Sequence, residues 1–219
     1  MRRAAVAMAV VLVASCSGDS AATTTTTPTT TTIPVETTFT LPGSETESVF
    51  TAGDMVGVIG AAHDVTHWLI SFPGGLGGVE RELLPTQTGL EAVGTAWQVD
   101  DMFWERLRLG DREGYFPRSM LGYIGEPEDV TSLFNALSAE SVESLGEAIA
   151  GEIEAAEIVL VGSSPLEVVY DVLGLGDDSV AGYRIRVLAI EDSDGFVAEL
   201  VQRTPLCARG WDDESGRCS

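Results

Sequence analysis

Lysine is absent from this chain of 219 residues, and its 12 basic residues, all arginine, stand against 34 acidic ones. The formal net charge of −22 argues against nucleic acid as a partner, because binding to a phosphate backbone needs clustered cationic side chains. The same charge disfavours direct adsorption to anionic lipid headgroups. We therefore expect a solvated acidic surface and no nucleic-acid partner.

Histidine is almost as scarce, since the chain holds only His63 and His67, four residues apart. On a helix this spacing places both rings on one face, where they can bind one zinc ion. On a strand the two residues stand about 13 Å apart, too far for one ion. The adjacent residues WLISF and the Pro-Gly turn that follows favour a strand. We therefore expect no metal and no cofactor.

Motifs that carry catalysis are also missing. The sequence has no Gly-x-Ser-x-Gly elbow, phosphate-binding loop, dinucleotide fingerprint or Cys-x-x-Cys pair. The acidic run Asp192 to Gly195 lacks the distant glutamate of a calcium loop and is interpreted as a hairpin turn. We predict a protein without catalytic residues, and an enzyme that uses the histidine pair is kept as a residual alternative.

Long apolar runs are scarce near the start of the chain, where the apolar run is too short to span a bilayer as a helix, which takes about 20 residues. Its first apolar run, residues 4–14, follows two arginines and precedes Cys16, as in a secretory signal peptide. The residues VASC resemble the lipobox of bacterial lipoproteins, which implies cleavage after residue 15 and a lipid on Cys16. We expect export and anchorage at the extracytoplasmic face of the membrane. A plain secretory signal with an accidental Cys16 is the alternative.

Three cysteines occur in the whole chain. With Cys16 assigned to a lipid, Cys207 and Cys218 are expected to form a disulfide, because export places them in an oxidising compartment. The closed loop would contribute on the order of 2–3 kcal/mol, chiefly by restricting the unfolded state. Two free thiols or a pair of metal ligands are the alternatives.

Composition divides the rest of the chain into three segments. Residues 16–47 are mostly Thr, Ser, Pro and Gly, so we expect a disordered tether that cannot bury enough apolar surface to fold. Residues 48–126 hold short alternating runs bounded by Gly, Asp or Pro, which indicates a small all-β barrel. Residues 127–219 begin with two helical patterns and continue with alternating runs.

The helical patterns cover residues 130–137 and 142–153, with Ser138 or Ser141 placed to cap the second. The alternating runs that follow are joined by Asp-rich turns, which indicates an antiparallel meander. We therefore predict a multidomain chain, with an all-β barrel followed by an α+β domain that has an antiparallel sheet.

The run FWERLRLGDREGYFPRSML, residues 103–121, resembles the late strands of the bacterial SH3-like (SH3b) domain, and the resemblance covers about residues 57–125. It implies an SH3-like barrel that binds ligands in a shallow aromatic groove without catalysis. Trp104 matches the strand tryptophan of the family, and Gly114 with Tyr115 matches its Gly-Trp pair. The candidate ligand-binding residues are Trp68, Trp104 and Tyr115, with packing in the core as the alternative.

The early strand departs from the family pattern. Pro73 and Gly74 keep its turn, but Ile70 and Phe72 stand where the family has an arginine and a glycine, so we expect a different ligand specificity. The C-terminal segment resembles extensions of actinobacterial exported proteins. We hypothesise a lipid-anchored protein that binds peptidoglycan or an envelope protein. The alternative is a lipoprotein accessory subunit whose C-terminal domain docks a protein partner, with the barrel as a spacer.

Overall fold

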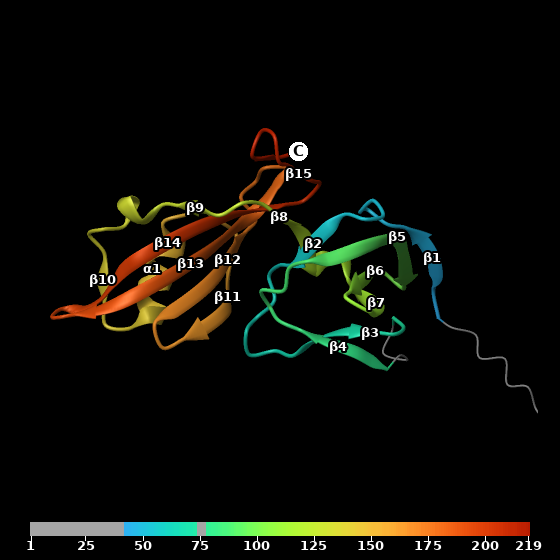
Figure 1. Cartoon of the computed structure of the whole chain (residues 1–219), viewed down its shortest axis with the longest axis horizontal. Coiled ribbons are helices and arrows are strands. Elements are labelled where there is room, and N and C mark those ends of the chain that lie inside the picture. The colour runs from blue at the N-terminus through green and yellow to red at the C-terminus, as the bar shows by residue number, and fades with distance from the viewer. Residues whose placement is uncertain (1–41, 74–77) are drawn as a thin grey trace, which may run out of the picture. The chain divides into compact units, whose positions relative to one another are not determined.

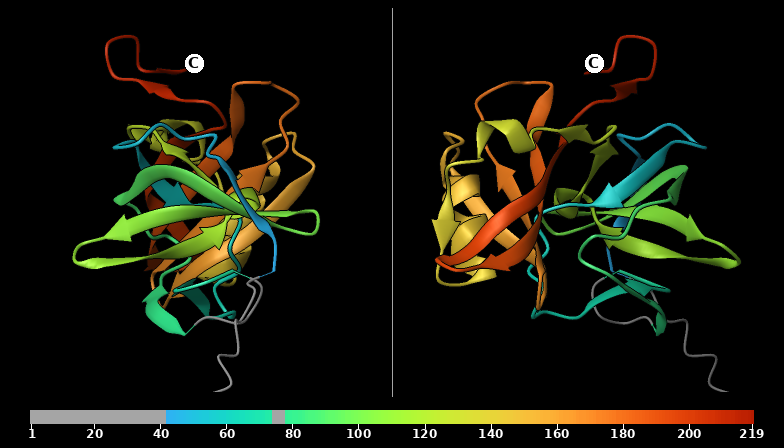
Figure 2. Two further views of the ribbon diagram at one scale, coloured as in Figure 1. Left: turned by 90° about the vertical axis from the view of Figure 1, so that its right-hand side faces the viewer. Right: turned by 60° about the vertical axis from the view of Figure 1, so that its left-hand side comes forward.

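A computed structural model describes residues 42–73 and 78–219 (Figures 1 and 2). The predicted signal peptide, Cys16 and most of the predicted tether lie outside the described residues. Contacts group Leu41–Ser219 into one compact unit. Within the described ranges, every helix is too short or too polar to span a bilayer.

Most described strands belong to one antiparallel sheet, whose order is β11-β12-β13-β14-β8-β2-β5-β6-β7-β3-β4. The strands of this path are β2 (Met55–Val58), β3 (His67–Ile70), β4 (Val79–Leu83), β5 (Leu90–Val99), β6 (Met102–Leu109), β7 (Arg112–Pro117), β8 (Leu121–Ile124), β11 (Glu157–Ser164), β12 (Glu167–Leu173), β13 (Val180–Asp192) and β14 (Gly195–Cys207). Three short strands pair off this path: β1 (Ser44–Glu47) with β5, and β9 (Glu128–Asp129) and β10 (Ser138–Ala139) with β14. β15 (Trp211–Asp212) and β16 (Arg217–Cys218) form a separate ribbon.

The predicted fold class, a barrel followed by an α+β domain, is wrong. β14 pairs along most of β13 and, at its end, also pairs with β8 through Leu206 opposite Ile124 and Cys207 opposite Tyr123. β8 in turn pairs with β2, so the strands before and after residue 126 form a single 14-stranded sheet in the described chain. With 13 residues, β14 is long enough to give its backbone groups to partners on both sides.

The predicted antiparallel meander is present as β11 to β14. One described α-helix, α1 (Val142–Gly151), packs on β12 and β13 through Leu145 and Ile149, which are fully buried. Ser141 caps it, because its Oγ accepts a hydrogen bond from the Ser144 amide at 3.1 Å. A second buried cluster lies between the strands before residue 126. The second predicted helix is therefore confirmed, although it ends earlier than expected.

The first predicted helix, residues 130–137, does not form. The 3₁₀ turn η2 (Thr131–Leu133) replaces it, flanked by β9 and β10. The Val130 amide donates to the Val201 carbonyl on β14 (2.9 Å), and the Thr131 hydroxyl accepts from the Val201 amide (2.8 Å). These contacts, and the pairing of β9 and β10 with β14, hold the segment along β14 in a non-helical conformation, so tertiary structure overrides the helical spacing.

Glycine at position 114 allows two strands to approach each other. A Cβ atom there would lie 2.7 Å from the Ile70 carbonyl oxygen on β3, closer than real contacts allow. β3 meets β7 at the next residue, where Ile70 is opposite Tyr115. The glycine that matches the SH3-like pattern thus has a packing reason in this chain.

Cys207 and Cys218 form a disulfide, as predicted, with a Cα–Cα distance of 5.3 Å. Cys207 is the last residue of β14 and is fully buried. The bond ties the ribbon of β15 and β16 to the end of the longest hairpin of the sheet.

Candidate functional site

A cavity with a volume of about 760 Å³ lies at the tip of the β5–β6 hairpin. This size is within the range of small-molecule sites, roughly 300–1,000 Å³. We call it the aromatic cavity. It is lined by the hairpin tip, the start of β6 and the 3₁₀ turn η1 (Arg118–Met120): Val99, Asp100, Asp101, Met102, Phe103, Trp104, Arg118 and Ser119.

The hairpin tip places two carboxylates at the rim of the aromatic cavity. Val99 and Met102 pair directly, which leaves Asp100 and Asp101 as a two-residue loop. Asp100 has φ of 51°, a left-handed conformation that Asp tolerates better than most residues. The Gln98 side-chain amide donates to the Asp100 carbonyl at 2.9 Å. Both aspartates are exposed, so their charges face solvent and any ligand.

Arg118 contributes the positive charge of this lining, and a buried carboxylate balances it. Glu105 is fully buried on β6 and accepts hydrogen bonds from Arg118 Nε and Ser48 Oγ, both at 2.5 Å. The Arg118 guanidinium also lies 4.4 Å from the Phe103 ring centroid, within the range of a cation–π contact. A buried carboxylate is strongly unfavourable without such partners, so Arg118 is held against Glu105.

Trp104 is the one candidate aromatic residue that lines the aromatic cavity. It lies on β6, directly opposite Trp97 on β5 and Pro117 on β7. Its neighbour Glu105 points into the core, so the alternation along the strand places Trp104 on the outer face. The structure therefore places the tryptophan matched to the SH3-like pattern in the lining of the aromatic cavity.

Tyr115, on β7, and Trp68, on β3, do not line the aromatic cavity. Tyr115 packs edge-on against Phe72, with ring centroids 6.1 Å apart, and Phe72 also contacts Trp97 at 5.2 Å. Burial raises the pKa of Tyr115, so its hydroxyl stays protonated at neutral pH. Trp68 is 40% exposed on β3, opposite Glu82. Trp104 and Tyr115 are partly buried, and none of the three candidate aromatics is among the fully buried core residues of the described chain.

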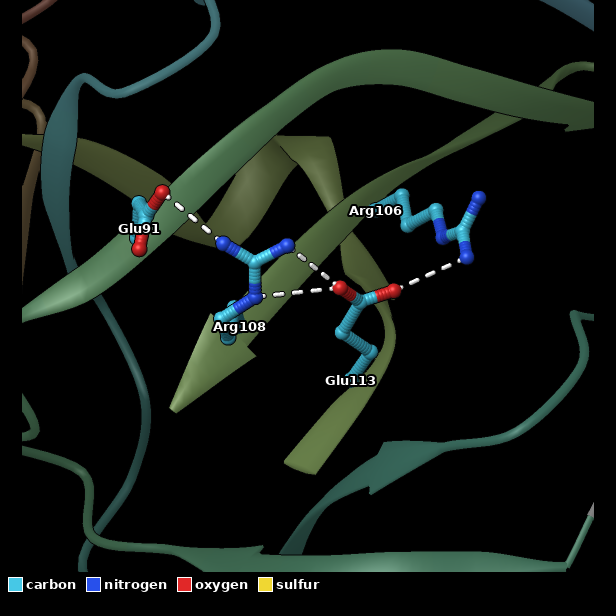
Figure 3. A network of polar contacts seen from close by, with 4 residues as sticks. All are labelled: Glu91, Arg106, Arg108 and Glu113. Carbon is cyan, nitrogen blue, oxygen red and sulfur yellow. Dashed lines mark hydrogen bonds and ion pairs between the residues drawn. The ribbon is translucent and has the colours of Figure 1, made fainter. Parts of the chain in front are cut away.

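Four charged side chains form an ion-pair network on the outer face of β5, β6 and β7 (Figure 3). Arg108 donates to Glu91 (3.0 Å) and, through two nitrogens, to Glu113 (3.0 and 2.6 Å). Arg106 donates to the other oxygen of Glu113 at 2.8 Å. The hydrogen bond from Arg108 is the main reason that the pKa of Glu113 lies below its usual value. Arg106, which lies opposite Tyr115, and Arg108 are thus both already paired with carboxylates.

The histidine pair does not share a strand. His67 begins β3, and its Nε2 donates to the Ala62 carbonyl at 3.3 Å. His63 lies in the turn before the strand, where its amide donates to the Leu160 carbonyl at 3.0 Å. Residues 42–73 and 78–219 contain no group of three His, Cys, Asp or Glu side chains arranged to hold a metal ion. The run Asp192 to Gly195 is a hairpin turn, as predicted.

Sequence reasoning missed most of the aromatic cavity. Two acidic residues between two alternating runs are a signal for a hairpin, and Asp100 and Asp101 could have been assigned to its tip. Phe103 and Met102 follow directly in the same run. Arg118 had no such signal, because its place beside Glu105 depends on the pairing of β6 with β7.

No family model, no curated protein and no solved structure matches this chain.

Proposed function

We propose that this chain is an exported, non-catalytic binding protein, anchored through a lipid on Cys16, that binds a cell-wall peptide or a segment of an envelope protein in the aromatic cavity. The observation that carries the proposal is the cavity itself, in which Trp104 and Phe103 lie beside two exposed carboxylates. The lipobox-like signal and the Thr-rich segment support a position at the cell envelope. The sequence resemblance to SH3-like domains supports a binding role.

The charges of the aromatic cavity favour a ligand with an amino group. Arg118 is balanced by Glu105, so Asp100 and Asp101 leave the cavity with net negative charge. An ammonium group can interact with these carboxylates and with the face of Trp104. The net charge of −22 also attracts cationic ligands over a longer range at low ionic strength.

A catalytic role has no support from the lining of the aromatic cavity. Ser119 is its one hydroxyl side chain among the described residues, and neither histidine lines the cavity to act as its base. The aspartates are exposed at the tip of a hairpin rather than held against a nucleophile. Binding without chemistry is therefore the role that we propose.

The proposal is tested with residues 17–219, produced without the signal peptide, on purified cell wall at low salt. We expect the protein to be retained and Trp104→Ala to reduce retention about tenfold, since a buried aromatic contact contributes 1 kcal/mol or more. Trp68→Ala is the matched control, because Trp68 is exposed outside the cavity. The proposal would be contradicted if purified cell wall does not retain the unmodified chain, or if both variants lose retention equally.

The second candidate is an accessory subunit that docks a protein partner through its C-terminal strands. It is favoured by β11, a terminal strand in the sheet order, on which Ile158 is 41% exposed. Deletion of residues 127–219 cannot distinguish the two functions, because it would remove β14 from β8. Ile158→Arg is a better test: loss of a co-purified partner with wall retention unchanged would favour this function.

A further inference from the structure

A second cavity lies where the loop between β4 and β5 faces the side of β12, β13 and β14 that α1 does not cover. We call it the junction cleft, and its volume is about 350 Å³. Its polar residues are Thr86 and Thr88 from the loop, and Glu167, Arg184, Arg186, Gln202 and Thr204 from the sheet. It shares no lining residue with the aromatic cavity.

Arg184, which also lines the junction cleft, has its charge fully paired. Its Nε and Nη2 donate to the two carboxylate oxygens of Asp171 at 2.7 and 2.9 Å. Asp171 is fully buried and Arg184 is 8% exposed. Because two parallel hydrogen bonds join the pair, this part of the lining is electrically neutral and geometrically fixed.

Arg186 is paired in the same way. Its Nε and Nη2 donate to the two oxygens of Glu167 at 3.0 and 2.7 Å, and its Nη1 donates to Gln202 Oε1 at 3.0 Å. Neither guanidinium is therefore left as a receptor for an anion. The net charge of the chain, −22, also repels anions.

The remaining polar groups of the junction cleft are uncharged. Because Gln202 Oε1 accepts from Arg186, the other end of that amide carries two N–H donors. The hydroxyls of Thr86, Thr88 and Thr204 can each donate and accept. Val169, Ile124 and Pro127 add apolar surface beside them. Donors and acceptors mixed in this way, without net charge, match the hydroxyls and C–H faces of a sugar ring.

We propose that the junction cleft binds a neutral saccharide. The site is separate from the aromatic cavity, and this inference does not rest on the proposed function. Because none of the described lining residues is aromatic, the sugar ring has no stacking partner, and we expect a dissociation constant in the millimolar range.

The test is a nuclear magnetic resonance titration of ¹⁵N-labelled residues 17–219 with triacetylchitotriose, and with maltotriose as a second neutral saccharide. We expect at least one of the two to shift the signals of the Gln202 side-chain amide and the Thr88 backbone amide in a saturable way. Inorganic phosphate and spermidine are the ionic probes. The proposal would be overturned if only an ionic probe shifts these signals, or if none of the probes shifts them at tens of millimolar.

Thr204→Val is the first variant, because it removes one hydroxyl while keeping a β-branched side chain on β14. We expect about fivefold weaker saccharide binding, as for the loss of one hydrogen bond. Thr66→Val, at an exposed threonine outside both cavities, is the matched control. Gln202→Leu is the second variant, and thermal unfolding of each protein verifies its folding. Unchanged affinity in folded Thr204→Val and Gln202→Leu would also overturn the proposal.

Discussion

Arg184 on β13 and Asp171 on β12 hold together segments that are more than a hundred residues apart in the sequence. Besides its two bonds to Asp171, Arg184 donates from Nη2 to the Val58 carbonyl at 2.8 Å. The Gly60 amide donates to Asp171 Oδ2, also at 2.8 Å. This buried pair therefore fixes the segment after β2 against the C-terminal strands.

Arg184→Met should destabilise the protein by about 3–5 kcal/mol, because it leaves the buried Asp171 charge without its partner. Urea unfolding at neutral pH measures the change. Arg209→Met is the control, since Arg209 is exposed and its pair with Asp178 is expected to contribute at most about 1 kcal/mol. A similar small loss in both variants would show that the pair does not hold the two segments.

Asp100→Asn combined with Asp101→Asn should weaken binding of an amine-bearing ligand to the aromatic cavity. The probe is the peptide Ala-Ala-Lys, compared with its acetylated form, with tryptophan fluorescence as the readout. We expect the unmodified chain to prefer the free amines about tenfold at low salt, and the double variant to lose this preference. Equal affinity of the unmodified chain for both peptides would argue against an amine ligand while leaving open the binding of a neutral one.

Stability should fall as the pH drops below about 4.5, the ordinary pKa of glutamate. Hydrogen bonds from Arg108 and Arg186 lower the pKa values of Glu113 and Glu167 in the folded state. These two glutamates therefore stabilise the fold at pH values above their pKa in the unfolded state. This stabilisation is lost as the pH falls through their lower pKa in the folded state. In urea unfolding between about pH 6 and pH 3, the free energy of unfolding should fall less for Glu113→Gln than for the unmodified chain. Glu82→Gln, at an exposed residue of β4, is the control and should match the unmodified chain.

Reduction of the Cys207–Cys218 disulfide should lower the free energy of unfolding by about 2–3 kcal/mol, because the bond restricts the unfolded chain. Thermal unfolding with and without a reductant measures the effect. The double variant Cys207→Ser with Cys218→Ser should match the reduced protein and should not respond to the reductant. An unchanged midpoint after reduction would contradict this prediction.

Gly114→Ala should destabilise the protein by roughly 1–3 kcal/mol, since the new Cβ would press against the Ile70 carbonyl. Gly151→Ala is the matched control, because a Cβ at the end of α1 meets nothing within 4 Å. That control should be neutral or slightly stabilising, as alanine is the better helix former. Equal midpoints of urea unfolding for the two variants would show that β3 can move away from β7.

The candidate site was predictable only in part. Trp104 was identified from its place in a motif, and it lines the aromatic cavity. Trp68 and Tyr115 belong to the same motif argument but do not line the cavity, which is confined to the tip of the β5–β6 hairpin, the start of β6 and η1. Arg118 and Glu105 meet across β6 and β7, and a linear sequence carries no local signal for such a contact.

Local signals in the sequence were sufficient for the hairpins, the C-terminal meander, α1 with its Ser141 cap and the disulfide partners. Each of these depends on alternation, turn residues or caps within a short stretch of chain, or on a cysteine count. Tertiary structure alone decided that residues 130–137 form no helix, that the strands make one sheet, and that Arg184 binds Asp171. The physical reason is that β14 offers backbone groups to β8, β9, β10 and β13, and pairing with distant strands outweighs local preference.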